Sequence, residues 1–451
     1  MMSEEKTGNN SAKQNIEHIL YGHNRIEGVT GFDVDGGGTA VLFQRRGDIV
    51  EHQTFNHRFF FILSEEKYAE GLDSEEPVCL DGDGFYRHVY YFPSRGKLWK
   101  ACKNAIRNYN RINSTNFKHN ELYQIPDLLH IPDTEIQFLL QSGVGQFRGM
   151  KFSGLRRMQI AVTAATPWEP EYTLASDEEN RILCIALSDN IGWRHVMHAG
   201  EQLESEMLEE LRRVVAERDP DVIEGHNLLR FIFPLLAVKF QKYKIEFQLG
   251  RRMYGVERYE TTQYMDGKRI PFANFTIPGR HVIDTLFLAT NQSSRISPDV
   301  DDLDTCAVAN ELVGAEKYPL PRKKYSLDSW AADADRVIGE TQKHAEATLA
   351  ISEMLLPAEF HQAQMVPIPL GKLCMSGQAR KIDLMMLRAY LHAGRAIPRS
   401  PQPEPFEGGY NELFVTGKCL NVAKVDVAAQ YPSIMIGERI APASDSLGVF
   451  L

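Results

Sequence analysis

The stretch Val422–Ile436, VAKVDVAAQYPSIMI, places one carboxylate, Asp426, between two apolar runs. The apolar residues before Asp426 predict a strand that brings this side chain to its end. Gln430–Ser433 and a second apolar run follow. An aspartate at the end of a strand most often caps a turn, so the type of residue alone does not indicate catalysis. The role of Asp426 depends on the rest of the chain.

The bulk composition is that of a soluble globular protein of two or three domains. The chain has 451 residues, of which 43% are hydrophobic and 24% charged, and these are ordinary values. It contains no apolar run of about 18 residues, which argues against a membrane span. The N-terminal MMSEEKTGNNSAKQN has no apolar core, so we expect no signal peptide and a disordered start over residues 1–12. We expect a cytoplasmic protein, associated with the nucleoid if the source is prokaryotic.

Cysteine usage and charge narrow the kind of site. The six cysteines include no Cys-x-x-Cys pair, which predicts reduced thiols rather than disulfides or a zinc site. The net charge of −10 argues mildly against indiscriminate nucleic-acid binding. It does not exclude DNA, because a local basic surface decides such binding.

The first third of the chain is rich in strand patterns. Residues 31–63 predict a hairpin or meander with a turn at Gly47-Asp48. DGDG at 81–84 lacks the further ligands of a calcium loop, so we expect a tight turn. Residues 95–112 predict an amphipathic helix with a basic surface. Such a helix fits a DNA contact or, more commonly, a solvated face.

Strands and helices alternate from about residue 150 to residue 357, which predicts an α/β domain. Residues 156–166 and 180–190 have the pattern of buried strands, and residues 344–357 that of a helix closed by Pro357. Residues 397–409 are rich in proline and end in two glycines. This pattern is typical of a stiff linker, and it is the best candidate for a domain boundary.

Two stretches at this boundary resemble the entry to the palm domain of family B DNA polymerases. FEGGYNELFVTG (406–417) is similar to the family's Tyr-x-Gly-Gly element, with Phe406 in the place of tyrosine and Glu407 following it. KVDVAAQYPSIMI (424–436) is similar to its first palm motif, Asp-x-x-Ser-Leu-Tyr-Pro-Ser-Ile, with Ala429 and Gln430 in the place of Ser-Leu.

Other stretches extend the resemblance over residues 30–451: NHRFFFIL (56–63), residues 131–160 and DPDVIEGHNLLRFIFPLL (219–236). The resemblance implies a multidomain protein of α/β and α+β class. Its expected parts are an N-terminal mixed domain over 1–147, an RNase H-like exonuclease-type domain over 148–365, a return segment and linker over 366–409, and the start of the polymerase palm over 410–451. The return segment is expected to fold back on the N-terminal domain.

The exonuclease of this family hydrolyses DNA with two metal ions, which oxygen ligands hold. The resemblance aligns its four carboxylates with Ala161, Thr163, Ile232 and His344. Alanine, threonine and isoleucine cannot hold magnesium, so the resemblance implies a nuclease fold without nuclease activity. Asp284 survives nearby, and a structural or helix-capping role is expected for it. Glu340 and His344 could improvise another metal site, but a pair on a helix surface is the favoured interpretation.

The polymerase site of the family also uses two Mg²⁺ ions, and the resemblance implies roles for several residues. Asp426 is implied as the catalytic and metal-binding carboxylate, with the carbonyl of Val427 as a further metal ligand. Ala429, Gln430 and Tyr431 are implied to bind the incoming dNTP, Tyr431 by excluding a 2′-hydroxyl. A glycine pair allows close approach of a template strand. The implied DNA-binding residues are Gly408, Gly409 and Tyr410.

The family's other palm aspartates and its fingers lysine lie beyond the first palm motif, so this chain alone is expected to be inactive. A second polypeptide, or a missing C-terminal part, would complete the site on primed DNA. The alternative is a non-catalytic DNA-binding or scaffolding protein derived from such a polymerase. An active 3′–5′ exonuclease is the least favoured function. The basic stretches 251–252 and 322–324 fit either a DNA path or a solvated surface.

Overall fold

The computed structural model describes residues 17–165, 180–252, 255–265, 268–291, 304–318, 325–399, 408–410, 412–423 and 425–449. The chain divides into two compact units. The first consists of Met1–Phe59, Pro93–Gly96 and Ile131–Arg388, and the second of Phe60–Phe92, Lys97–His130 and Ala389–Leu451. The domain bounds expected from the sequence stay predictions, and the expected disorder of residues 1–12 lies outside the described residues.

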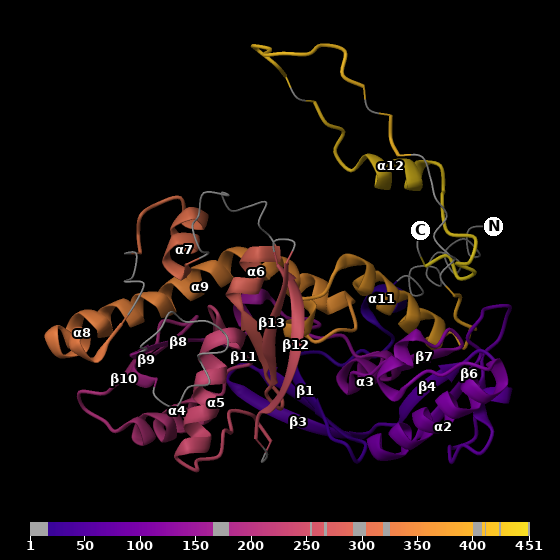
Figure 1. The fold of residues 1–451 in the computed structure, drawn as a ribbon, viewed down its shortest axis with the longest axis horizontal. Helices are drawn as coiled ribbons and strands as arrows, with labels where there is room; N and C mark the ends of the chain where they lie inside the picture. The colour runs from indigo at the N-terminus through magenta and orange to yellow at the C-terminus, as the bar shows by residue number, and fades with distance from the viewer. Residues whose placement is uncertain are drawn as a thin grey trace, which may run out of the picture. The chain divides into compact units, whose positions relative to one another are not determined.

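A five-stranded mixed sheet dominates the first unit (Figure 1), with the strand order β10, β9, β8, β11, β14. Strands β8, β9 and β10 form an antiparallel meander, whereas β11 runs parallel to β8 and β14 runs parallel to β11. The bounds are Arg157–Ala165 (β8), Arg181–Asp189 (β9), Arg194–His198 (β10), Val222–Gly225 (β11) and His281–Asp284 (β14). The two buried strands predicted from the sequence are confirmed as β8 and β9.

Alternate residues of β8 face opposite sides of the sheet. Ile160 and Val162 belong to the same core as Leu211 of α4 (Glu204–Arg218) and Leu235 of α5 (Phe233–Lys242). Ala161 and Thr163 face the long helix α9 (Ala334–Met365) instead. Every residue of β8 is buried, as expected for a strand that is covered on both faces.

Helix α9 contains Pro357 in its interior, so the prediction that this proline closes a helix was wrong. A proline inside a helix removes one backbone hydrogen bond and costs about 3 kcal/mol. Leu355, Leu356 and Phe360 on either side of it are fully buried. Because each such side chain stabilises the fold by about 1.5–3 kcal/mol, the packing outweighs the local preference.

The first unit also contains a small antiparallel sheet, β1-β2-β3, and the hairpin β12–β13. Gly47 between β2 and β3 has φ 63°, which confirms the predicted turn. The strands are β1 (Val29–Val34), β2 (Thr39–Arg46), β3 (Ile49–Asn56), β12 (Glu257–Met265) and β13 (Lys268–Thr276). The remaining helices are α3 (Thr134–Ser142), α6 (Thr285–Asn291), α7 (Thr305–Val313), α8 (Leu327–Ala332), α10 (Leu370–Leu373) and α11 (Gln378–His392), whose last residues belong to the second unit.

The second unit holds a four-stranded sheet of order β5, β6, β4, β7 and the helix α2 (Arg95–Asn113). The amphipathic helix predicted at 95–112 is thereby confirmed. Backbone bridges join Asp81 to Arg395 and Tyr86 to Ile397, so the chain after α11 returns to the strand-rich region, as expected. The other elements are β4 (Phe59–Leu63), β5 (Val78–Cys79), β6 (His88–Phe92), β7 (Leu128–His130) and α12 (Gln430–Gly437).

Candidate functional sites

Ala161, which the sequence resemblance aligns with the first nuclease carboxylate, is closely packed on all sides. It lies in the middle of β8, is 5% exposed, and belongs to a small buried cluster with Ala186 of β9 and Ala345 of α9. Three methyl side chains let the helix approach the sheet closely. No polar group from these three side chains is available to a metal ion or to a phosphate.

Thr163, two residues further along β8, is tied to the same helix. Its hydroxyl lies 2.7 Å from the hydroxyl of Thr341. Thr341 in turn donates to the carbonyl of Val337 over 2.7 Å. Since a hydroxyl has one proton, Thr163 is the donor to Thr341. The pair is buried and mutually satisfied, which is the arrangement of a structural contact.

Ile232 ends a π-helical turn, Leu228–Ile232, that leads into α5. Its side chain is buried in the main hydrophobic core of the first unit. An aspartate at this position would lie among the apolar side chains of that core. Ala161 and Thr163 belong to a different set of contacts, with α9.

Asp284, the acidic residue at the end of β14, uses its carboxylate to cap backbone N–H groups. It accepts hydrogen bonds from the N–H groups of Asn227 (2.9 Å), Leu229 (2.9 Å) and Leu286 (3.0 Å). Burial raises the pKa of Asp284 to about 6, although the three N–H groups act in the opposite direction. The capping role expected from the sequence is confirmed by these contacts.

Glu340 and His344 of α9 do not form a metal site with other described residues. Glu340 accepts from the Tyr325 hydroxyl (3.0 Å) and from Nε of Arg336 (2.8 Å). Nε2 of His344 is buried and has no hydrogen-bond partner among the described residues, and burial lowers the pKa of this imidazole. Within the described residues, no group of three or more His, Cys, Asp or Glu side chains could hold a metal ion.

Buried charges that the sequence analysis did not single out join β8 to its neighbours. The Arg157 guanidinium donates to Glu224 of β11 over 3.2 Å and also contacts Ser352 and Glu353 of α9. Gln159 adds a hydrogen bond of 2.8 Å to Glu224. The signal that could have revealed this network is a charged residue in each of two otherwise apolar strands, since a buried charge needs a partner.

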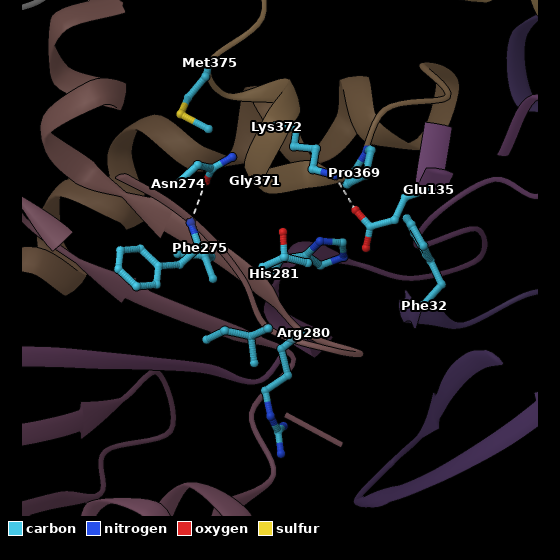
Figure 2. Close-up of a pocket in the computed structure, with 13 residues that line it drawn as sticks. Phe32, Glu135, Asn274, Phe275, Arg280, His281, Pro369, Gly371, Lys372 and Met375 are labelled. Carbon is cyan, nitrogen blue, oxygen red and sulfur yellow. Dashed lines mark hydrogen bonds and ion pairs between the residues drawn. The ribbon is translucent and has the colours of Figure 1, made fainter. Parts of the chain in front are cut away.

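A small cavity in the first unit is too small for a nucleotide. Figure 2 shows Lys372 directed at Glu135 among the residues that line this cavity, which include His281 and Asn274. Lys372 Nζ lies 2.6 Å from Glu135 and 2.6 Å from Asp133. The cavity measures about 30 Å³, enough for one or two water molecules. It is a small internal cavity with polar walls and is too small to be a substrate site.

Asp426 stands in an exposed segment without regular structure. Its carboxylate accepts from the backbone N–H of Val427 over 3.0 Å. The prediction of a strand leading to Asp426 was wrong, because residues 422–423 and 425–427 form no strand. A strand exists only where another strand pairs with its backbone, and no described strand pairs with this segment.

The other predicted polymerase residues lie near Asp426 in sequence and are exposed. Ala429 has φ 50° and precedes α12, whose first turn holds Gln430 and Tyr431. The Tyr431 side chain is 78% exposed. Gly408, Gly409 and Tyr410 are exposed as well. Phe406 and Glu407, which carried part of the resemblance, lie outside the described residues.

Arg251 belongs to an internal ion network, so neither a DNA path nor a solvated surface describes it. Its side chain is 5% exposed and donates to Asp219 and Asp221 over 2.8 Å each. Arg45 of β2 donates to Asp221 over 2.7 Å and Arg280 to Asp219 over 2.7 Å. Arg252 lies near Asp33 and Asp35, and residues 322–324 lie outside the described part of the chain.

Comparison with known proteins points to DNA polymerases. No family model matches the chain. The chain is 23% identical over 276 residues to a DNA polymerase of Archaeoglobus fulgidus, which is 60% of this chain and 32% of the polymerase. It is 26% identical over 253 residues to a DNA polymerase of Pyrococcus horikoshii, 53% of this chain and 19% of that protein. It is 24% identical over 281 residues to a DNA polymerase of Thermococcus gorgonarius, and the match covers 58% of this chain and 34% of that polymerase.

A solved structure extends the likeness to the fold. The family B DNA polymerase from the hyperthermophilic archaeon Pyrobaculum calidifontis matches 83% of this chain and 51% of its own chain, with a TM-score of 0.59 and 15% identity. The protein thus has a mixed α/β multidomain fold that resembles part of a family B polymerase. It is a distant homologue of archaeal family B DNA polymerases over rather more than half of its length. The chain spans about a third or less of the length of the curated relatives cited.

Proposed function

We propose that this chain is the N-terminal part of a family B DNA-directed DNA polymerase. Nucleotidyl transfer from dNTP to primed DNA would take place when a further part, in the same or another polypeptide, supplies the rest of the palm and the fingers. The observation that carries the proposal is the match of 83% of this chain to about half of a family B polymerase, together with distant sequence homology to DNA polymerases. No described helix is long and apolar enough to cross a membrane.

In this proposal Asp426 is one of the carboxylates of the polymerase site. Its exposure, and the lack of any side-chain partner for it among the described residues, leave it available to a metal ion. DNA polymerase homology implies Mg²⁺ in general. The described residues do not fit a two-metal site by themselves, because they hold no cluster of acids. In this proposal the chain supplies one carboxylate to the metal site.

The exonuclease-type domain is proposed to be inactive. The strand order, with an antiparallel meander followed by two parallel strands, supports an RNase H-like fold. Ala161, Thr163 and Ile232 are all buried and satisfied by packing or by a hydroxyl pair. Two-metal hydrolysis needs carboxylate oxygens around both ions, and these positions supply none.

An exonuclease assay tests the inactive domain. The purified chain is incubated with Mg²⁺ and a 5′-labelled single-stranded oligonucleotide. We expect the oligonucleotide to stay full-length. Shortening from the 3′ end that stops when EDTA is added would show that the domain is active, and the proposal for this domain would then fail.

The mass of the native protein tests the proposed incompleteness. The protein is isolated gently from its source and its components are weighed. A 51.2 kDa chain accompanied by a second chain with further palm acids, or a single longer chain that begins with this sequence, supports the proposal. A native chain of this mass that functions in the cell without a second chain bearing the missing palm and fingers residues contradicts the proposal.

One observation favours a second candidate, a non-catalytic DNA-binding or scaffolding protein. The nuclease positions have been replaced by residues that pack, as Ala161 does against Ala345, so this lineage tolerates loss of catalytic acids. The retained Asp426 argues for the polymerase instead, because a scaffold has no need of an exposed carboxylate in a polymerase motif. Activity of an Asp426 variant in the complete assembly separates the two candidates.

A further inference from the structure

Helix α2 is basic in an acidic protein. It has 19 residues, which include six Lys or Arg residues and no Asp or Glu, in a chain of net charge −10. These cations are Arg95, Lys97, Lys100, Lys103, Arg107 and Arg111. A local basic surface of this kind, rather than the charge of the whole chain, is what indicates a binding site for a polyanion.

The cations at the centre of α2 share one face. Leu98, Cys102, Ala105 and Tyr109 are buried on one side of the helix. Lys100, Lys103 and Arg107 follow each other at spacings of three and four residues, which places them together on the opposite side. Lys100 and Arg107 are exposed and Lys103 is half-buried. Figure 1 labels this helix as α2.

Lys97 and Arg111, toward the two ends of the helix, have acidic partners, whereas the cations at its centre have none in the described part of the chain. Lys97 lies 3.2 Å from Asp73, and Arg111 lies 2.5 Å from Glu70. Among the described residues, no carboxylate lies within ion-pair distance of Lys100, Lys103 or Arg107. The exposed cations of the centre therefore remain available to a partner from outside.

Helix stability does not explain this distribution. Cations near a helix N-terminus oppose the helix dipole, and acidic residues are favoured there. The first turn of α2 contains no acidic residue but contains Arg95 and Lys97. The sequence thus departs from the stabilising pattern in favour of uninterrupted positive charge.

An aromatic side chain lies beside the cations. Trp99 is 48% exposed, and Nζ of Lys103 lies 5.8 Å from the centre of its ring. An exposed indole next to cations is the arrangement that stacks on an unpaired base while the cations bind the backbone. In a duplex the bases already stack on one another, so the indole has no free base to contact. The face therefore suits a single strand.

We propose that Trp99, Lys100, Lys103 and Arg107 form a binding face for single-stranded DNA. The three cations contact successive phosphates, and the indole stacks on a base without sequence preference. A helix rises about 1.5 Å per residue, so these cations lie about 4.5 to 6 Å apart along the axis, within reach of neighbouring phosphates. The proposal goes beyond the polymerase function and does not depend on Asp426, since the binding needs no metal and no other part of a polymerase.

The experiment is fluorescence anisotropy of a labelled dT20 oligonucleotide with the full chain at several salt concentrations. We expect the triple variant Lys100→Gln, Lys103→Gln, Arg107→Gln to raise Kd at least about 10-fold at low salt. The slope of log K against log salt should become shallower by about 2, because each phosphate contact on a single strand contributes about 0.7. Trp99→Ala should raise Kd by about 5- to 100-fold and leave this slope unchanged.

A matched control removes the same charge elsewhere. Lys118→Gln, Lys151→Gln, Lys317→Gln alters three exposed lysines outside α2 and should leave Kd within about 2-fold of the wild type. Lys100→Arg, Lys103→Arg should keep the affinity, which distinguishes lost contacts from a misfolded helix. Equal loss of affinity in the triple variant and in the control would overturn the proposal. The proposal would also be overturned if the wild-type chain did not bind dT20. This holds even if the chain binds another polyanion, such as polyglutamate or anionic lipid vesicles.

Discussion

The Thr163 hydroxyl on β8 donates a 2.7 Å hydrogen bond to the Thr341 hydroxyl on α9. The Thr341 hydroxyl in turn donates a hydrogen bond to the Val337 carbonyl. The pair lies at a position where the resemblance to family B polymerases places a metal-binding carboxylate. A contact between two elements has taken the place expected for a catalytic group, and its contribution is to stability.

This pair yields a prediction about coupling. Thr341→Val leaves the Thr163 hydroxyl buried without an acceptor, so we expect the free energy of unfolding to fall by about 1–3 kcal/mol. Thr163→Val should have a smaller effect, because Thr341 keeps its bond to Val337. The double variant should be less destabilised than the sum of the two, and urea unfolding measures all three. Additive effects would mean that the two hydroxyls do not interact.

Restoring an acid to the nuclease-type domain should destabilise it without restoring activity. Ala161→Asp places a carboxylate in the buried cluster with Ala186 and Ala345. An uncompensated buried charge lowers the free energy of unfolding by about 3–5 kcal/mol. Ala358→Asp on the exposed side of α9 is the control, with an expected change of about 0.5 kcal/mol or less. Equal stability of both variants would show that the Ala161 position is open to solvent.

The Arg157–Glu224 pair should behave as a buried ion pair. Arg157→Met leaves Glu224 buried and lowers the free energy of unfolding by about 3–5 kcal/mol. Arg157→Met with Glu224→Leu removes both charges and should recover much of this loss. Thermal unfolding of the single and double variants measures the difference. A double variant that is as unstable as the sum of the two single changes would refute the pairing.

Much of this architecture could be predicted from the sequence, and its failures have physical causes. Strands β8 and β9 and helix α2 followed from apolar patterns, because burial of one or both faces leaves a periodic trace. Pro357 was misjudged because the packing of distant residues overrides a local preference. The strand before Asp426 was misjudged because pairing depends on residues far away in the chain.

The candidate sites divide in the same way. The resemblance to a nuclease motif predicts that Ala161, Thr163 and Ile232 stand where acids are expected, and this remains a prediction. The partners of these residues in the structure, such as Thr341 and Ala345, could not be predicted, because they come from a helix far along the chain. The role of Arg251 was missed since a basic pair in a sequence does not reveal the acids that surround it.

Three histidines that are buried or half-buried should make the protein sensitive to acid. Burial lowers the pKa of His57, His130 and His281 to about 4 from 6.5. Between these values the unfolded chain binds more protons than the folded one. Stability is therefore fully present above pH 6.5 and is lost as the pH falls towards 4.

The variant His281→Phe tests whether a buried imidazole causes this loss of stability in acid. The ring of His281 lies edge-on to Phe32 and Phe147, a setting that accepts a phenyl ring. Proton uptake on unfolding near pH 5 should fall by about one proton, as measured by the pH dependence of the unfolding free energy. His119→Phe, at an exposed position, should leave the pH dependence unchanged. An unchanged slope in His281→Phe would show that this imidazole titrates normally in the folded protein.

We propose that Asp426 supplies a carboxylate to a polymerase site that further residues complete. Primer extension by the native assembly carrying Asp426→Asn tests this most directly, with Glu438→Gln on the same exposed segment as the control. We expect Asp426→Asn to reduce extension by about 10³-fold or more, a loss of about 4 kcal/mol of transition-state stabilisation, and Glu438→Gln to leave extension unchanged. Extension by Asp426→Asn at the wild-type rate would show that this carboxylate is not part of the polymerase site.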